Sequence, residues 1–322
     1  MSSSPSILVV RLSAIGDLVV VAPVVAQLHH EGYKVSLLCK DAYRPVALCL
    51  PGVAEVYSWE KDRVKLAEQG CNFTVVLDLQ GTAKSKRWTR GLKVKVLTYK
   101  KPYFRRILLL VFGQRFALEP VVSRYFKAAE PLLKNGAGAP AELVLPKTTL
   151  TLPEEPYIAM VIGGTHAGKR LNYDQWRLAI RELLKLGLPI ALVGGPEEAS
   201  IGESLEQPLG SGVSNYCGTT TIIEGMAVVK EAALVISGDT GFMHAAANFK
   251  RPLISLWGAT HPSLGFAPWP HYSAQFQIIA KGRSPISKHG KVRWWQRNPM
   301  NKFPVEEIAL IAEQILRDRT TL

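Results

Sequence analysis

Short apolar runs rich in β-branched residues alternate with longer helical patterns through the first half of the chain. Ile7–Val10 is followed by the turn Arg11–Asp17, and Leu18–His30 has the length and pattern of a helix. Further strands are predicted at Lys34–Cys39, Ala54–Trp59 and Phe73–Leu77. Strands that alternate with helices indicate a parallel sheet.

The same alternation returns after Lys134–Pro156, a stretch rich in Gly, Ala, Pro and Thr that has little periodicity. Strands are predicted at 157–162, 189–193, 234–236 and 253–256, and helices at 174–186, after the capping box that begins at Thr221, and at Val305–Leu316. We therefore expect two similar α/β domains, residues 1–150 and 151–322, whose mainly parallel sheets face a central cleft. Such folds bind ligands at the carboxyl ends of their strands.

The composition is that of a globular protein with an anionic partner. Of 322 residues, 47% are hydrophobic and 20% charged, which excludes disordered and fibrous classes. Lys and Arg number 39 against 26 Asp and Glu, so the formal net charge is +13. Nucleic acid, phospholipid and phosphorylated substrates are all compatible with that charge.

Cysteine usage and hydropathy predict a reduced cytoplasmic protein. Cys39, Cys49, Cys71 and Cys217 show no C-x-x-C spacing, and no Cys/His cluster has the spacing of zinc ligands. No secretory signal is evident, and the longest nearly apolar run, Leu18–Ala26, is about half a membrane span. We expect neither metal nor cofactor, and contact with a membrane only at its surface.

The segment Ser237–His244 lies between a predicted buried strand and a helix. Its small residues let a ligand approach backbone N–H groups, and a helix N-terminus favours an anion such as a diphosphate. His244 falls about one turn into the helix, where its ring could meet the same ligand. The alternative is that Asp239 or Thr240 only caps the helix and His244 is a core residue.

Gly163–Arg170 also follows a predicted strand and matches the phosphate-binding pattern G-x-x-x-x-G-K. Arg170 stands where a Ser or Thr hydroxyl would hold magnesium, so we expect Thr165, Lys169 and Arg170 to bind phosphate without hydrolysing a triphosphate. A solvated basic turn is the alternative, and a phosphate-loop nucleotidase is a further one that the missing hydroxyl disfavours.

Gly16-Asp17 occupies the first strand-to-helix turn. The helix dipole favours an ionised aspartate there. In a closed, desolvated site that carboxylate could take a proton from a substrate hydroxyl. A plain helix-capping role is equally compatible with the spacing.

Two basic runs contain no acidic residue. Residues 84–106 hold ten Lys and Arg with four aromatic residues, and residues 281–302 hold seven with Trp294-Trp295. Such mixtures suit anionic lipid head groups or single-stranded nucleic acid, and a solvated face is the third possibility. A nucleic-acid or nucleotide-binding protein without catalytic activity is therefore an alternative function.

The first turn and four later motifs together resemble one enzyme family. Arg11–Val19 with Ala22-Pro23 is similar to the opening of the ADP-heptose:lipopolysaccharide heptosyltransferase family, glycosyltransferase family 9. The later motifs follow in the family's order, at 164–170 with Trp176, 194–198, 238–244 and 256–262. The resemblance runs from about residue 7 to residue 265.

The resemblance implies a GT-B fold of two Rossmann-like domains, with the acceptor on the first domain and the nucleotide sugar on the second. It also implies that the last helix, about 304–317, packs back on the first domain. It implies metal-independent, inverting transfer of heptose from ADP-heptose to the lipopolysaccharide inner core at the inner face of the cytoplasmic membrane, with no nucleic acid as partner. Asp17 would be the general base, and Lys169 would stabilise charge on the leaving diphosphate. The other donor-binding residues would be Thr165, Arg170, Glu198 at the ribose, Asp239, Thr240, Gly241 and His244. The acceptor would contact Ser13, Gly16, Lys84, Lys86, Arg87 and Arg90.

Three departures from the family pattern surround the expected donor site. Leu171-Asn172 stands where the family commonly has Trp-Pro, Ala259 and His261 stand where Pro and Asp are usual, and the run 281–301 lacks the usual cysteine. These departures bear on which sugar and which nucleobase the donor carries more than on the type of reaction.

Overall fold

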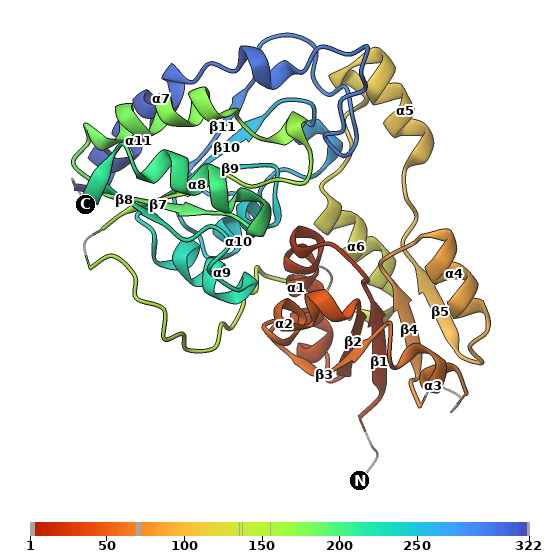
Figure 1. Cartoon of the computed structure of the whole chain (residues 1–322). Coiled ribbons are helices and arrows are strands. Elements are labelled where there is room, and N and C mark those ends of the chain that lie inside the picture. The colour runs from red at the N-terminus through yellow and green to blue at the C-terminus, as the bar shows by residue number, and fades with distance from the viewer. Residues whose placement is uncertain (1–3, 69–71, 135, 137, 155, 321–322) are drawn as a thin grey trace. The chain divides into compact units, whose positions relative to one another are not determined.

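The chain divides into two compact units. The computed structural model describes residues 4–68, 72–134, 136, 138–154 and 156–320, so Cys71 lies outside the described residues. The first unit comprises residues 1–103 and 119–146, and the second comprises 104–118 and 147–322 (Figure 1). Each unit is built on one sheet.

The first unit has five parallel strands in the order β3-β2-β1-β4-β5. Its strands are β1 (Ser6–Val10), β2 (Lys34–Cys39), β3 (Val53–Ser58), β4 (Val75–Asp78) and β5 (Lys95–Thr98). Its helices are α1 (Ile15–His30), α2 (Arg44–Leu48), α3 (Arg63–Glu68), α4 (Ala83–Arg90) and α6 (Val121–Ala129).

Both faces of this sheet are covered, which explains the uninterrupted apolar run of β1. Leu8 and Val10 point into a core that includes Leu66 of α3, with Trp88 of α4 packed against it. Helix α1 packs against α2 and α6 (Figure 1).

The second unit has six parallel strands in the order β11-β10-β9-β6-β7-β8. Its strands are β6 (Ile158–Val161), β7 (Ile190–Val193), β8 (Val213–Asn215), β9 (Leu234–Gly238), β10 (Leu253–Trp257) and β11 (Gln275–Ile279). Its helices are α5 (Tyr103–Phe112), α7 (Tyr173–Leu184), α8 (Ala199–Glu206), α9 (Ile222–Glu231), α10 (Gly241–Asn248) and α11 (Glu306–Thr320). The first residue of α5, Tyr103, still belongs to the first unit.

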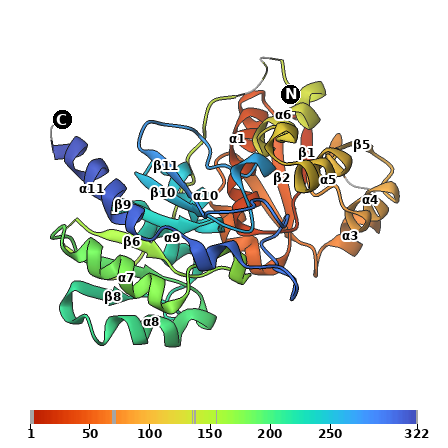
Figure 2. The ribbon, with the colours of Figure 1, turned by 90° about the horizontal axis from the view of Figure 1, so that it is seen from above.

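Two segments of the second unit are placed by tertiary contacts. The last helix, α11, packs against α7, β10 and β11 within its own unit (Figure 2). Its packing on the first domain stays a prediction. Residues 104–118, which the sequence analysis put in the N-terminal domain, join the second unit because the Leu118 N–H donates to the Ser263 carbonyl, at 2.8 Å, and Gln114 Nε2 lies 3.0 Å from His261 Nε2.

The α/β class and the mainly parallel sheets are confirmed, and the strands that the sequence analysis missed lie at sheet edges. β5, β8 and β11 are all outermost strands. Edge strands are buried on fewer sides, so their sequences need less apolar character. The central strands could therefore be predicted from their apolar runs, whereas the edge strands β5, β8 and β11 could not.

Strand order reverses between β1 and β4 in the first sheet and between β6 and β9 in the second. In open parallel sheets, ligands bind outside the carboxyl ends of the strands at this switch point. The turns after β1, β6 and β9 carry the motifs singled out above. None of the helices in the described part of the chain combines the length and apolar character needed to span a bilayer.

Candidate functional site

In the first unit, the turn after β1 holds the Asp17 carboxylate in a fixed orientation. Its Oδ2 forms an ion pair with Arg11 and accepts from the Ala14 N–H, at 3.3 Å, at the start of α1. The Tyr125 hydroxyl of α6 donates to Oδ1, at 3.3 Å. The Arg11 side chain is 7% exposed and that of Asp17 is 25% exposed. Solvent therefore reaches the carboxylate but hardly reaches its partner.

Burial acts to lower the pKa of Arg11, but Asp17 together with Tyr125 and Tyr99 outweighs burial, so the pKa is raised. Burial raises the pKa of Tyr125 well above its usual value, so the phenol stays a hydrogen-bond donor. Oδ1 accepts only this one long bond among the described residues, so it can accept a further hydroxyl.

The neighbouring turn after β4 is fixed by Asp78. Its carboxylate accepts from the Gln80 and Gly81 N–H groups, at 3.0 and 2.9 Å, and from Ser85 Oγ of α4, at 2.9 Å. Burial raises the pKa of Asp78. Gln80 Oε1 accepts from the Leu12 N–H, at 3.1 Å, which joins this turn to that of β1. Asp78 is thus a positioning residue that the sequence analysis missed.

The expected acceptor residues lie at this edge of the sheet because β1 and β4 are parallel neighbours. Ser13 and Gly16 belong to the turn after β1 and the first turn of α1, and both are partly exposed. The four cations Lys84, Lys86, Arg87 and Arg90 lie on α4, whose N-cap is Thr82. Lys84 Nζ lies 5.1 Å from the ring centroid of Trp59, and Arg90 is at the far end of the helix. Acceptor binding by these residues stays a prediction.

In the second unit, Lys169 and Asp239 form a largely buried ion pair. Lys169 Nζ lies 2.8 Å from Asp239 Oδ2 and donates to the Asp239 carbonyl, at 3.0 Å. The Lys169 side chain is 19% exposed and that of Asp239 is 8% exposed. The two loops follow β6 and β9, which are neighbours, so the topology alone brings these residues together.

Two glycines keep the backbone close around Lys169. A β-carbon at Gly238 would lie 2.1 Å from the Lys169 carbonyl oxygen, and one at Gly290 would lie 2.5 Å from Lys169 Cγ. Gly290 belongs to the second basic run, which thus forms one wall of the site. Gly290 was not among the site residues predicted from the sequence.

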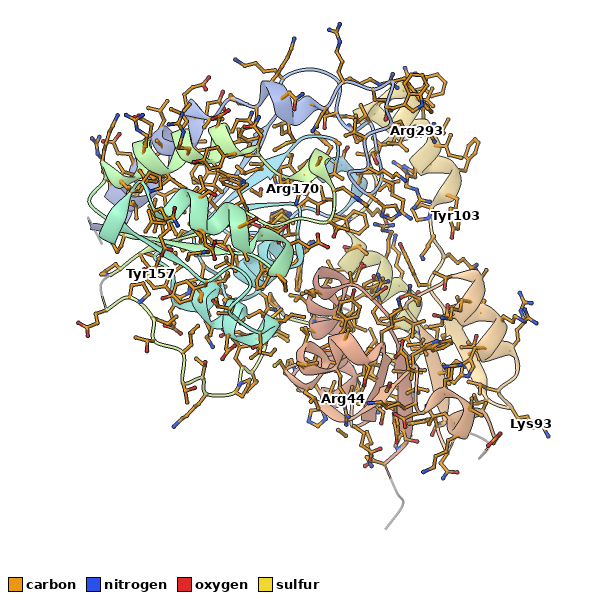
Figure 3. The ribbon with its side chains drawn as sticks, viewed as in Figure 1. Arg44, Lys93, Tyr103, Tyr157, Arg170 and Arg293 are labelled. Carbon is orange, nitrogen blue, oxygen red and sulfur yellow. The ribbon has the colours of Figure 1, made fainter. Side chains whose placement is uncertain are left out.

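Glu198 is held by its own turn and by Arg170. Arg170 Nη1 lies 3.1 Å from Glu198 Oε1, and the Gly195 N–H donates to Oε2, at 2.9 Å. The Glu198 side chain is 9% exposed, against 38% for Arg170, which is labelled in Figure 3. The structure brings Glu198 and Arg170 to the same edge of the sheet, and the contact of Glu198 with a ribose stays a prediction.

The motif after β9 caps and begins α10. Thr240 Oγ1 accepts from the Met243 N–H, at 3.4 Å, and lies 3.0 Å from Ser237 Oγ. Gly241 is the first helical residue, and His244 is buried within the helix, at 5% exposure. Thr165 is exposed in the loop after β6. The capping interpretation of Thr240 is therefore correct, and it leaves the first N–H groups of α10 available to an anion.

The basic run 281–302 packs over the loops of this site. The Ile286 and Ser287 N–H groups both donate to the Ala259 carbonyl, at 3.0 Å. Asn298 Nδ2 donates to the Ala167 carbonyl, at 3.1 Å. Burial, together with the charges of Lys288, Lys169, Arg106 and His166, lowers the pKa of His289 to about 4. The site is therefore strongly electropositive.

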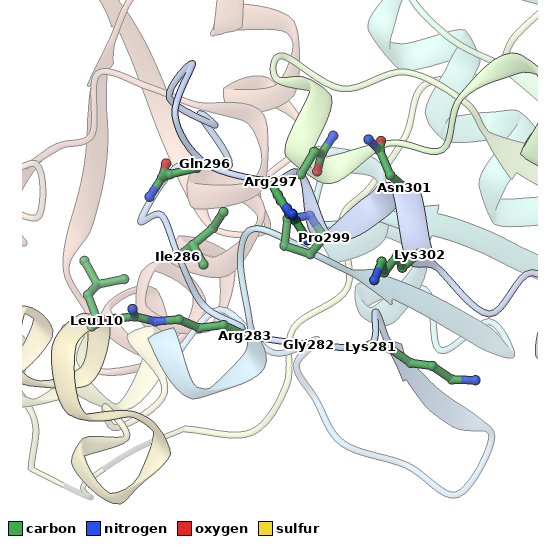
Figure 4. Close-up of a pocket in the computed structure, with 11 residues that line it drawn as sticks. Leu110, Lys281, Gly282, Arg283, Ile286, Gln296, Arg297, Pro299, Asn301 and Lys302 are labelled. Atoms are coloured by element: carbon green, nitrogen blue, oxygen red, sulfur yellow. Dashed lines mark hydrogen bonds between the residues drawn. The ribbon is translucent and has the colours of Figure 1, made fainter.

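A cavity of about 960 Å³ lies beside the same run (Figure 4). Its wall includes Leu110 of α5 and four cations but no carboxylate; the cations are Lys281, Arg283, Arg297 and Lys302. Arg283 Nη2 donates to the Leu110 carbonyl, at 2.7 Å. Within the described ranges, no three His, Cys, Asp or Glu side chains come together as the ligands of a metal ion would.

Comparison with known proteins identifies the family. The model of glycosyltransferase family 9 (heptosyltransferase) matches residues 63–292. The chain belongs to glycosyltransferase family 9. This membership favours a sugar transferase over the nucleic-acid and nucleotidase alternatives.

Individual members of family 9 are similar to different extents. Lipooligosaccharide heptosyltransferase 2 of Haemophilus influenzae is 31% identical over 121 residues, which span 36% of this chain and only 35% of that protein. Lipopolysaccharide heptosyltransferase 3 of Escherichia coli is 22% identical over 95% of this chain and 98% of its own length. The solved ADP-heptose lps heptosyltransferase II of E. coli has a TM-score of 0.75 at 18% identity and covers 98% of this chain and 99% of its own. This likeness confirms the GT-B fold class.

The structure gathers the predicted residues into two groups, one at the switch point of each sheet. Arg11, Tyr125 and Asp78 were missed in the first group, and Gly290 and His289 in the second. Tyr125 gave no signal in the sequence, because nothing local links α6 to the first turn. The acid-free run 281–302 did give a signal, but it did not reveal what the run contacts.

Proposed function

We propose that the protein is an inverting glycosyltransferase that moves heptose from ADP-heptose onto the lipopolysaccharide inner core or a related anionic lipid-linked acceptor. The observation that carries the proposal is the buried Lys169–Asp239 pair beside the start of α10, within an electropositive site. An ammonium group and the N–H groups of a helix end are complementary to a diphosphate. The name of the E. coli structural neighbour includes ADP-heptose, which supports this donor.

The chemistry is a single displacement. Asp17 Oδ1 takes the proton of the acceptor hydroxyl while its oxygen attacks the anomeric carbon, and the bond from that carbon to the diphosphate oxygen breaks. One displacement inverts the anomeric configuration. Lys169 and the N–H groups of Thr240 and Gly241 stabilise the charge that develops on the departing ADP. These groups supply the positive charge that a metal ion supplies in other transferases, so the proposed reaction is metal-independent.

The remaining residues have positioning roles in this scheme. Arg11 and Tyr125 orient the base, and Asp239 holds the ammonium group of Lys169. Thr165, Arg170, Glu198 and His244 would contact or orient the donor. The cations Lys84, Lys86, Arg87 and Arg90 of α4 would bind phosphate or carboxylate groups of the core saccharide. The enzyme would work on the cytoplasmic face of the membrane as a peripheral protein.

Thermal unfolding with ADP-, GDP- and UDP-linked sugars tests the donor. A ligand at about 100 times its Kd raises the free energy of unfolding by about 2.7 kcal/mol. We expect ADP-heptose to raise the melting temperature well above the other sugars. ATP with magnesium and oligonucleotides serve as controls, and equal stabilisation by all nucleotides would contradict the proposed donor.

Asp17→Asn tests the base. The amide keeps the shape and can still accept from Arg11, but it cannot take a proton, so transfer should fall by about 10²–10⁴. ADP binding, measured by calorimetry, should be unchanged. Asp41→Asn is a matched control, because Asp41 follows the neighbouring β2 and lies 2.7 Å from Lys61 Nζ in an exposed ion pair. Near wild-type turnover in Asp17→Asn would exclude the proposed role.

A further inference from the structure

Helix α5 turns an apolar stripe toward solvent. Phe104, Ile107, Val111 and Phe112 are 74%, 58%, 56% and 53% exposed, and Leu108 is partly exposed beside them. Residues at i, i+3, i+4 and i+7 share one face of a helix. The opposite face is packed, with Leu109 only 1% exposed in a small cluster with Leu118 and Leu264. An apolar stripe of this kind usually packs against a hydrophobic core. Its exposure to solvent therefore indicates a surface that binds another molecule.

Two tryptophans add to this apolar surface. Trp294 and Trp295 are 92% and 59% exposed, and their rings contact each other edge to face at 5.4 Å between centroids. The Arg293 guanidinium lies 5.2 Å from the Trp295 ring centroid. Arg293 extends from this segment in the same part of Figure 3 as α5. Tryptophan prefers the boundary between lipid and water, where its ring is buried and its N–H stays hydrated.

The two segments belong to one unit, in which α5 contacts the basic run 281–302 that carries the tryptophans. Arg283 Nη2 donates to the Leu110 carbonyl of α5, at 2.7 Å. Leu110 also lines the same cavity as Gln296 and Arg297, two residues beyond the tryptophan pair (Figure 4). Leu110 therefore links the helix to the loop that carries the tryptophans.

The charge around these side chains has a single sign. Residues 104–118 contain three Arg, residues 281–302 contain seven Lys and Arg, and neither segment contains Asp or Glu. Among the described residues, Arg297 and Lys302 form no ion pair. Their charge is therefore available to an external anion.

We propose that α5 and residues 291–297, here named the aromatic-basic surface, dock the protein on an anionic phospholipid bilayer. Aromatic and aliphatic side chains would enter the interface while the arginines meet lipid phosphates. A second copy would bring the same positive charge against this surface, and a nucleic acid would leave the Ile107 and Val111 side chains in water. The inference rests on the proposed function, because a lipid-linked acceptor brings the enzyme to a bilayer.

Co-sedimentation with vesicles tests the proposal without donor or acceptor. Wild-type protein should bind vesicles of phosphatidylcholine mixed with phosphatidylglycerol more tightly than vesicles of phosphatidylcholine alone, and salt should weaken the binding. Trp294→Ser with Trp295→Ser should weaken binding by about tenfold, and Ile107→Ser with Val111→Ser should do so comparably. Circular dichroism and thermal melts check that each variant folds.

Leu178→Ser and Leu310→Ser are the matched controls. Leu178 of α7 and Leu310 of α11 are 47% and 65% exposed in the same unit but lie outside the aromatic-basic surface. Both should bind vesicles as the wild type does. Binding that ignores phosphatidylglycerol, or tryptophan variants that bind as tightly as the wild type, would overturn the proposal. The proposal would also be overturned if the wild type is a dimer in sedimentation velocity and the tryptophan variants are monomers.

Transfer assays separate this inference from the proposed function. The tryptophan variants should keep wild-type transfer to a water-soluble, deacylated saccharide and lose transfer to the same saccharide anchored in vesicles. Equal loss on both acceptors would assign the surface to saccharide binding and overturn membrane docking. If no variant or wild-type protein transfers heptose while vesicle binding behaves as expected, the proposed function fails and the docking surface stands.

Discussion

Gly290→Ala tests whether the basic run 281–302 sets the position of Lys169. Gly290 has φ +82°, and a β-carbon there would lie 2.5 Å from Lys169 Cγ and 3.0 Å from Lys169 Cε. Gly187 has φ +79° and no atom within 4 Å of an added β-carbon. The pair of substitutions therefore shares the backbone strain and differs in the contact with Lys169.

The shared strain should cost about 1 kcal/mol in each variant. The contact with Lys169 adds little to that cost, because a flexible side chain can move away. Carbon atoms pack at about 3.5–4.0 Å, so Lys169 must shift by about 1 Å. The flexible stem lets the ammonium group keep its contact with Asp239, 2.8 Å away, but moves it from the position in which it meets the donor diphosphate. A charge-assisted hydrogen bond to the diphosphate that is lost in this way is worth about 1.5–3 kcal/mol, or about 10–100-fold in donor affinity.

Isothermal calorimetry with ADP and thermal melts measure the two effects separately. We expect similar losses of melting temperature in Gly290→Ala and Gly187→Ala, and weaker ADP binding in Gly290→Ala alone. Wild-type affinity in Gly290→Ala would refute the reasoning that the basic run positions Lys169. Equal weakening in both variants would refute it too, because strain far from the site would then suffice.

Two further predictions concern charges in the same unit. Lys169→Met should lower the free energy of unfolding by about 3 kcal/mol, because the buried Asp239 carboxylate loses its partner. Adding Asp239→Asn should restore stability in thermal melts but should not restore ADP binding. If the double variant binds ADP as the wild type does, the ammonium group has no role in donor binding. Because the folded pKa of His289 is about 4 and its ordinary value 6.5, the unfolded chain binds the proton more readily, so His289 lowers stability as the pH falls from about 6.5 to about 4. His289→Gln should remove this dependence of the unfolding free energy on pH between about 6.5 and about 4. Bound ADP should raise the pKa of His289 in an NMR titration. A pKa that does not change on ADP binding would place the ring away from the diphosphate.

The sequence predicted the parts of the site that short-range structure determines. A polar or glycine-rich turn after an apolar run marks the carboxyl end of a strand, so the turns holding Asp17, Lys169 and Asp239 could be recognised without a structure. Parallel neighbours then bring the last two together. The exposure of the apolar stripe of α5 could not be predicted, because its apolar spacing is that of an ordinary core-facing helix.

The sequence by itself determined the alternation of strands and helices, the excess of positive charge and the chemistry at the strand ends, because periodicity, turn residues and composition act over a few neighbours. Only the tertiary structure decided that Tyr125 meets Asp17, that Gly290 packs against Lys169 and that α5 joins the second unit. Those contacts join segments far apart along the chain. Their pairing depends on the burial of whole elements, which no local pattern encodes.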